Sequence, residues 1–211
     1  MLRNSRGAVG KGCLIALAVV VALAVIIGVL FSGNYNRFVS GQEGIEAAWS
    51  EIDNQYKRRF DLIPSLVETV KGAADFEKST LREVTEARAS VGKMQLPSNL
   101  PTDPAQLNEF MNAQNSLGGA LGRLMVVVER YPELKANQSF LSLQDQLEGT
   151  ENRIAVARRD YIDTVKNYNT SIRKFPGNLV AEMFGFERAA QIEAATEEER
   201  QRPEVNFGSD E

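Results

Sequence analysis

Residues 140–175 read FLSLQDQLEGTENRIAVARRDYIDTVKNYNTSIRKF, and the spacing of their apolar side chains decides the fold. Every seventh residue is large and apolar or aromatic: Phe140, Leu147, Ile154, Tyr161, Tyr168 and Phe175. The residues three positions further on are small or apolar: Leu143, Thr150, Ala157, Thr164 and Ser171. This repeat predicts one long helix over 137–175 with a coiled-coil-like apolar seam. Near its end Val165 and Ile172 become the apolar positions, so we expect the packing partner to change along the helix.

The segment before this helix predicts another long helix. Its apolar residues recur at steps of three and four between Ile45 and Val91, which indicates one continuous helix over 35–92. Pro64 lies inside it and predicts a kink, because proline removes one helical hydrogen bond and clashes with the preceding turn. Gly72 is a second weak point of this helix.

A proline-rich loop, LPSNLPTDP over 96–104, separates that helix from the next one. Asp103 as N-cap and Pro104 at the first position mark the start of a helix over 104–131. This helix contains three glycines whose cost in helix propensity predicts a close approach to the backbone of a neighbouring helix. They are Gly118, Gly119 and Gly122. A short helix over 178–184 is expected to follow the seam helix.

Residues 13–31, CLIALAVVVALAVIIGVLF, are uncharged and almost wholly aliphatic. As a helix they span roughly the 30 Å hydrocarbon core of a bilayer. A cleaved signal peptide is the alternative, but the run is longer than a typical signal and FSGN after it offers no cleavage site. The sequence therefore favours an uncleaved transmembrane helix, with the lipid bilayer as a partner.

The charges that flank this span predict its orientation. Arg3, Arg6 and Lys11 precede it, whereas the near downstream side is mainly acidic. The positive-inside rule then places the N-terminus in the cytoplasm and the helical domain outside it. A basic cluster at 57–59 follows not far behind, so a cytoplasmic helical domain is the alternative.

We therefore expect an all-α protein in which the span is followed by an antiparallel bundle of three long helices and one short C-terminal helix. The expected parts are a flank over 1–12, the span over 13–31, the bundle over 34–185 and an acidic tail over 186–211. The second helix is too short to cover the membrane-proximal stripe of the first. That stripe comprises Tyr35, Phe38, Ile45 and Trp49. Either the C-terminal segment folds back over it or copies of the chain pack there.

The chain has no histidine, which excludes Ser-His-Asp and Cys-His catalysis and di-iron sites built on Glu-x-x-His. We predict no catalytic, cofactor-binding or metal-binding residues, and no cofactor, although an oxygen-only Mg²⁺ or Ca²⁺ site stays open. Polar residues beside the seams are candidates for a structural polar layer: Arg59, Asp61, Glu129, Glu148, Glu151 and Arg158. Arg59 lies on an apolar stripe and requires a carboxylate partner, expected from 148–158. The acidic tail and the lack of a basic, aromatic-interleaved patch argue against nucleic-acid binding.

Several short motifs resemble the LemA family of bacterial membrane proteins. They are Tyr35-Asn36, Ala48-Trp49-Ser50, Arg59-x-Asp61-Leu62-Ile63-Pro64-x-Leu66-Val67, Ala87-Arg88-Ala89, the run 129–136 (ERYPELKA), the run 143–154, Ala157-Arg158, Tyr161, Tyr168-Asn169 and Phe175-Pro176. Ile162 departs from the family pattern, because a Tyr-Asn pair is expected there. The resemblance implies one N-terminal transmembrane helix, long antiparallel helices and no established enzymatic activity or cofactor. It also suggests a small external N-terminus, which is opposite to the orientation that the charges predict. We keep the orientation that the charges predict.

The function that these features predict is a non-enzymatic, membrane-tethered scaffold or binding module of the bacterial cell envelope. Its expected partners are the bilayer and either other envelope proteins or further copies of the chain. The alternative is a structural protein that self-assembles through the membrane-proximal stripe. An enzyme with a site built from the carboxylates is the third hypothesis.

Overall fold

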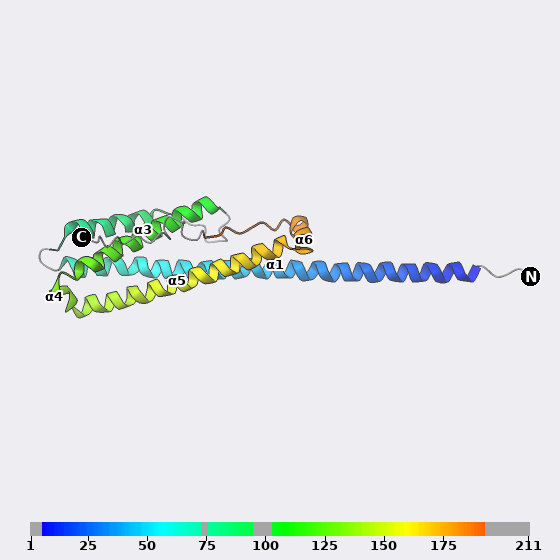
Figure 1. Ribbon diagram of the computed structural model, residues 1–211, viewed down its shortest axis with the longest axis horizontal. Helices are drawn as coiled ribbons and strands as arrows, with labels where there is room; N and C mark the ends of the chain where they lie inside the picture. Colours follow the sequence, from blue (N-terminus) through cyan, green and yellow to red (C-terminus); the bar gives the residue numbers. More distant parts are fainter. Residues whose placement is uncertain (1–5, 73–75, 95–102, 193–211) are drawn as a thin grey trace, which may run out of the picture.

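The computed structural model describes residues 6–72, 76–94 and 103–192, and within them every regular element is a helix (Figure 1). The helices are α1 (Arg6–Lys71), α2 (Lys78–Gly92), α3 (Pro104–Val128), α4 (Pro132–Lys135), α5 (Gln138–Arg173) and α6 (Gly177–Phe184). The predicted all-α fold is thereby confirmed. Figure 1 shows α2, α3 and α5 gathered around the C-terminal part of α1, while the N-terminal part of α1 extends alone from the bundle.

Helix α1 is continuous for 66 residues and joins the apolar segment directly to the bundle. From Leu14 to Leu30 its large side chains are all at least half exposed, whereas Phe38, Ile45 and Ile52 are fully buried. The apolar part is long and apolar enough to cross a membrane. The same helix therefore contains a segment suited to lipid and a segment that forms protein core.

The single helix predicted over 35–92 is wrong. Helix α1 continues through Pro64 but ends at Lys71, and α2 begins at Lys78 and runs back alongside α3 (Figure 1). This return buries Val84 of α2 among α3 side chains, which a straight continuation of α1 would have carried past the end of the bundle. The stripe of apolar residues is intact in both helices, so its periodicity could not reveal the break.

Helix α5 forms the seam that the seven-residue repeat predicts. The repeat residues up to Tyr168 are all buried. The predicted drift is also present, because Val165 and Ile172 are buried near the C-terminal end. Phe175 does not belong to the seam, since α5 ends at Arg173 and the Phe175 side chain is 81% exposed.

The buried side chains form two separate clusters. The membrane-proximal cluster includes Phe38, Trp49 and Tyr161, and the distal cluster includes Leu66 and Leu117. On α5 the boundary falls between Leu147, which belongs to the distal cluster, and Ile154, which belongs to the membrane-proximal cluster. The packing partner therefore changes along α5, as the drift of the stripe predicts.

The predicted backbone approach at the α3 glycines is wrong. A Cβ at Gly118 would lie 3.5 Å from the Arg59 Nη1 atom, and the other two glycines meet no neighbouring backbone within 4 Å. The close contact between long helices lies instead at Gly41 of α1, where a Cβ would be 2.8 Å from Tyr168 Cδ2 of α5. Gly118 thus faces a buried guanidinium rather than a helix backbone, at a distance where a Cβ would make ordinary van der Waals contact.

Residues 186–192 fold back over the membrane-proximal stripe, which confirms the first of the two predicted alternatives. They follow the left-handed Gly185 that ends α6, and they bury Ala189, Ala190 and Ile192. Trp49, 2% exposed, belongs to the same buried cluster as the strap residues and packs on Phe110 of α3, so α3 also reaches this stripe. We call residues 186–192 the strap. The strap packs with the bundle instead of starting the tail, and the predicted tail beyond it, 193–211, lies outside the described residues.

Candidate functional site

A buried arginine lies between the two hydrophobic clusters. The Arg59 residue on α1 is 3% exposed, and its Nη1 atom donates to Oε1 of Glu151 on α5 at 2.8 Å. Its Nη2 atom donates to the backbone oxygen of Gln114 on α3 at 3.0 Å and also to the Gln114 side-chain oxygen. The guanidinium carbon lies 5.1 Å from the centre of the Tyr56 ring, within reach of a cation–π contact. We call Arg59, Gln114 and Glu151 the polar layer.

The polar layer joins three helices through one charged group. Arg59 and Gln114 are buried, whereas the Glu151 side chain is 46% exposed, so the ion pair has one buried end and one solvated end. Within the described part of the chain, the Arg59 Nε atom has no hydrogen-bond partner. Gly118 on α3 faces the guanidinium, with its Cβ position 3.5 Å from Arg59 Nη1.

None of the other four candidates is a hydrogen-bond partner of Arg59 in the described part of the chain, although Asp61 and Glu148 line the grooves beside the polar layer and Arg158 lies near Tyr56. Asp61 is exposed on α1, and Glu129 is exposed and forms an ion pair with Lys135. Glu148 is exposed and accepts a hydrogen bond from Gln144 at 2.9 Å, and Arg158 is half-buried. Of the six predicted residues, the structure therefore brings together Arg59 and Glu151. Sequence reasoning missed the role of Gln114, although a polar residue on an otherwise apolar stripe could have indicated it.

Two open grooves flank the polar layer. One has a volume of about 480 Å³ and is lined in part by Tyr56, Asp61 and Gln114. The other has a volume of about 460 Å³ and is lined in part by Leu147 and Glu151. Among the residues that the structure describes, no group of three or more His, Cys, Asp or Glu side chains could hold a metal ion.

The strap is held by three buried side chains of α5. Tyr161 donates its hydroxyl hydrogen to the backbone oxygen of Ala190 at 2.8 Å, and Tyr168 donates to the backbone oxygen of Glu187 at 2.9 Å. The Asn169 side chain both donates to the Ala189 oxygen and accepts from the Ala189 nitrogen, each at 3.0 Å. The amide of Asn169 thus pairs with the strap backbone much as a neighbouring β-strand would.

The strap also covers aromatic side chains of α1. The ring of Phe186 lies 5.3 Å from that of Phe38 and 5.5 Å from that of Tyr35, both edge to face. Trp49 packs edge to face on Tyr161 at 5.7 Å. The sequence predicted buried tyrosines on the seam but missed the use of their hydroxyls. The Tyr168-Asn169 pair carries the signal, because two polar groups on a buried face need partners.

The tyrosines predict how stability depends on pH. Burial raises the pKa of the Tyr161 phenol above its ordinary value, and burial also raises the pKa of Tyr168. A tyrosine in the unfolded chain ionises near pH 10, so above about pH 10 the folded state binds more protons than the unfolded state. Stability is then unaffected below that pH and falls as the pH rises beyond it.

Urea unfolding between pH 8 and pH 12 tests this prediction. Tyr161→Phe keeps the ring and cannot ionise, so its loss of stability above pH 10 is expected to be shallower than that of the wild type. Equal slopes for the two proteins would show that Tyr161 does not contribute to the pH dependence.

The sequence is similar to one protein family and to several named proteins. The model of the LemA family matches residues 48–207. Magnetosome protein MamQ 2 of Paramagnetospirillum magneticum is 30% identical over 198 residues, which cover 85% of this chain and 72% of the relative. Magnetosome protein MamQ of Magnetospirillum gryphiswaldense is 29% identical and covers 89% of this chain and 75% of its own length. Protein LemA of Metamycoplasma hominis is 27% identical over 166 residues, which cover 79% of this chain and 72% of that relative.

The family match includes the whole polar layer, the α5 residues that hold the strap and the strap itself. It extends over more than half of the chain, and the resemblance seen in the short motifs agrees with it. The chain belongs to the LemA family.

Proposed function

We propose that this protein is a non-enzymatic, membrane-tethered scaffold of the bacterial cell envelope that holds a binding surface at a set distance from the bilayer. The observation that carries the proposal is the continuity of α1. This helix has no break between the exposed apolar segment and the bundle core, and over 66 residues it is about 100 Å long. A flexible tether would leave the bundle free to change its height and its direction relative to the span, whereas a continuous helix fixes both.

The polar layer supports the same proposal. Arg59 binds groups on both α3 and α5, so a shift of either helix by one turn would leave a buried charge without its partners. A layer of this kind favours one alignment of the helices over others of similar apolar burial. The bundle then presents the same surface in every copy, which a scaffold requires.

The two other hypotheses have less support. Self-assembly was expected from an uncovered stripe, but the strap and the bundle bury Phe38, Ile45 and Trp49 within one copy. An enzyme was expected from grouped carboxylates, but Asp61, Glu129 and Glu148 are exposed, and the last two are bonded to other neighbours. One relative is named a magnetosome protein and another only for the family, which suits a shared scaffold serving different systems.

We infer further that the chain is a single-pass protein of the bacterial plasma membrane with its bundle outside the cytoplasm. The support is the basic flank Arg3, Arg6 and Lys11. An alkaline phosphatase fused to the C-terminus is expected to be active in cells, because this reporter folds only outside the cytoplasm. An inactive phosphatase, together with an active cytoplasmic reporter at the same position, would reverse the orientation.

Photo-crosslinking in cells tests the scaffold. A benzoylphenylalanine at Val126, whose side chain is 71% exposed, is expected to give discrete products with an envelope protein. Seven flexible residues inserted between Ser32 and Gly33 are expected to reduce the yield severalfold, because the bundle then loses its fixed height and orientation. The same insertion between Ser98 and Asn99, in the loop predicted from sequence, is the control and is expected to leave the yield unchanged.

Two results would contradict the scaffold. An unchanged crosslinking yield with the insertion after Ser32 would show that α1 acts only as a tether and that its continuity does not matter for the contact. Products that contain only copies of this chain would favour self-assembly instead.

A further inference from the structure

The bundle end nearest the apolar segment carries an exposed apolar surface. Most large apolar side chains that are exposed beyond Leu30 lie at this end. They are Tyr35, Phe175, Leu179, Met183 and Phe184, and the exposed fractions of the last four are 81%, 46%, 65% and 52%. We call these five residues the apolar end. Isolated exposed apolar residues are ordinary, but a contiguous group marks a contact surface.

Helix α6 supplies most of this surface and is apolar on two sides. Its Val180 and Ala181 are buried against the bundle, whereas Leu179 and Met183, four residues apart, share an exposed face. Phe175 precedes the helix. When a helix buries one apolar face and exposes another, contact with a second apolar surface would remove the exposed face from water.

The position of α6 along α1 identifies that second surface. A Cβ at Gly177 would lie 3.0 Å from the Phe38 ring and 3.5 Å from the Asn34 side chain, and the Phe184 ring lies 5.0 Å from that of Tyr35. The apolar run ends at Phe31, so α6 meets α1 within about two turns of it, or roughly 5–10 Å along the axis. The headgroup layer of a bilayer is of similar depth, since it adds about 5–8 Å on each side of the hydrocarbon.

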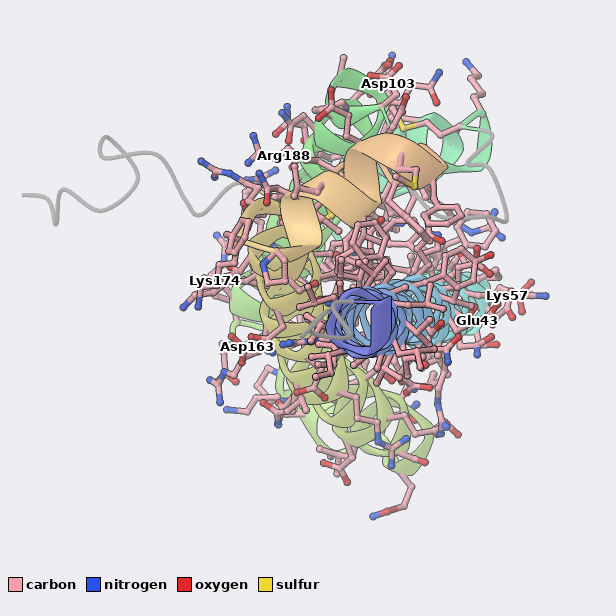
Figure 2. The ribbon with its side chains drawn as sticks, turned by 90° about the vertical axis from the view of Figure 1, so that its right-hand side faces the viewer. Glu43, Lys57, Asp103, Asp163, Lys174 and Arg188 are labelled. Carbon is pink, nitrogen blue, oxygen red and sulfur yellow. The ribbon has the colours of Figure 1, made fainter. Side chains whose placement is uncertain are left out.

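The direction of α6 and the nearby charges agree with this position. Figure 2 views the molecule along α1 from its N-terminal end, and α6 crosses the front of the bundle, transverse to α1. A helix transverse to a membrane span lies in the plane of the bilayer surface. Lys174 and Arg188 are labelled on one side of this view, as is Asp163. Within 173–188 the exposed cations Arg173, Lys174 and Arg188 outnumber the exposed Glu182 and Glu187. Cations beside an apolar helix face suit anionic lipid headgroups.

We propose that the apolar end is a second membrane contact, in which α6 lies in the headgroup region with Leu179 and Met183 directed at the lipid. This inference rests on the proposed membrane anchoring of α1. The span alone holds the bundle near the bilayer, whereas contact through α6 also fixes the rotation of the bundle about α1, because α6 lies to one side of it.

Spin labelling of the full chain in nanodiscs of phosphatidylethanolamine and phosphatidylglycerol tests the inference. In a Cys13→Ser background, single labels are placed by Met183→Cys, by Ile26→Cys within the span, and by Val126→Cys on α3 as an exposed apolar control. Oxygen, which concentrates in lipid, and a nickel chelate, which stays in water, report the depth of each label. We expect Ile26 to be deep, Met183 to be at the interface and Val126 to be in water.

A second variant tests the cause of that depth. Leu179→Asp combined with the Met183 label is expected to move the label into water, and the analogous change Val156→Asp on α5 is expected to leave it in place. All these positions are exposed, so we expect each variant to keep the bundle intact. Thermal unfolding of each labelled protein checks this.

The outcomes are distinguishable. A Met183 label in water with Ile26 deep in the bilayer would overturn the second contact and leave the anchor standing. An Ile26 label in water would overturn the anchor itself and the inference with it. A Met183 label shielded from both reagents, and broadened by a label on another copy, would assign the apolar end to a dimer and overturn the lipid contact.

Discussion

Replacing Asn169 with leucine is expected to release the strap from α5. The change removes both hydrogen bonds to Ala189 and leaves the buried nitrogen and oxygen of that residue without partners. Loss of each of the two hydrogen bonds costs about 0.5–1.5 kcal/mol net, so the two together cost about 1–3 kcal/mol. The strap can avoid this cost by detaching, so hydrogen exchange at 186–192 is expected to accelerate roughly ten- to a hundredfold, since each 1.4 kcal/mol is a factor of ten.

The consequences for the bundle can be measured in the same protein. Release of the strap uncovers Phe38 and Trp49, so the emission of Trp49, the only tryptophan, is expected to shift to longer wavelength. Asn167→Leu is the matched control, because Asn167 is exposed on the same helix. Slow exchange and unchanged emission in the Asn169→Leu protein would show that the apolar contacts and the hydrogen bonds from Tyr161 and Tyr168 hold the strap without Asn169.

Replacing Glu151 with alanine is expected to destabilise the bundle by about 2–3 kcal/mol. Removal of one member of a fully buried ion pair costs about 3–5 kcal/mol, and the half-exposed Glu151 carboxylate lowers that figure through solvent screening. Arg59 would remain buried with only the Gln114 oxygens and the Tyr56 ring as partners. Urea unfolding measures the change in the free energy of unfolding.

Two further variants separate the buried charge from other effects. Glu148→Ala removes an exposed carboxylate from the same helix and is expected to change stability by less than about 0.5 kcal/mol. Adding Arg59→Met and Gln114→Leu to Glu151→Ala is expected to recover most of the loss, because apolar groups of similar size replace the whole polar layer. Failure of this triple variant to recover stability would mean that the Glu151 contacts, and not the stranded charge, account for the effect.

The architecture could be predicted from the sequence to the extent that it depends on local periodicity. The repeat of seven from Phe140 located α5 within two residues at each end, and Asp103 caps α3 as predicted by accepting a hydrogen bond from the Ala105 nitrogen. Both features depend on residues close together in the chain, where helix geometry decides which side chains share a face.

The break between α1 and α2 could not be predicted in this way. The apolar stripe continues across it, and nothing local distinguishes a weak glycine inside a helix from one that ends it. The length of the partner helices decides where α1 ends, because α2 buries Leu81 and Val84 only by turning back onto α3. Pro64 was the stronger local signal, yet α1 remains helical through it.

The polar sites also combine features that the local sequence predicts with features that depend on tertiary contacts. The charge of Arg59 on an apolar stripe indicated that a carboxylate must meet it, but Glu148 and Glu151 were equal candidates until the rotation of α5 was known. The strap depends on contacts between Asn169 and a segment about twenty residues later that forms no regular element. Ile162, which departs from the Tyr-Asn pair that the resemblance led us to expect, packs its side chain against the membrane-proximal cluster.

Because α1 is unbroken, a small change in the tilt of its apolar segment produces a large movement at the far end of the bundle. From Phe31 to Lys71 the helix extends about 60 Å beyond the span, so a change of about 10° in the tilt of the span moves the far end of the bundle sideways by about 10 Å. Spans adjust their tilt to the thickness of the bilayer. With α1 anchored as proposed, thinning or thickening of the surrounding lipid would become a displacement of α4 and the distal cluster, larger than the change in the membrane that caused it.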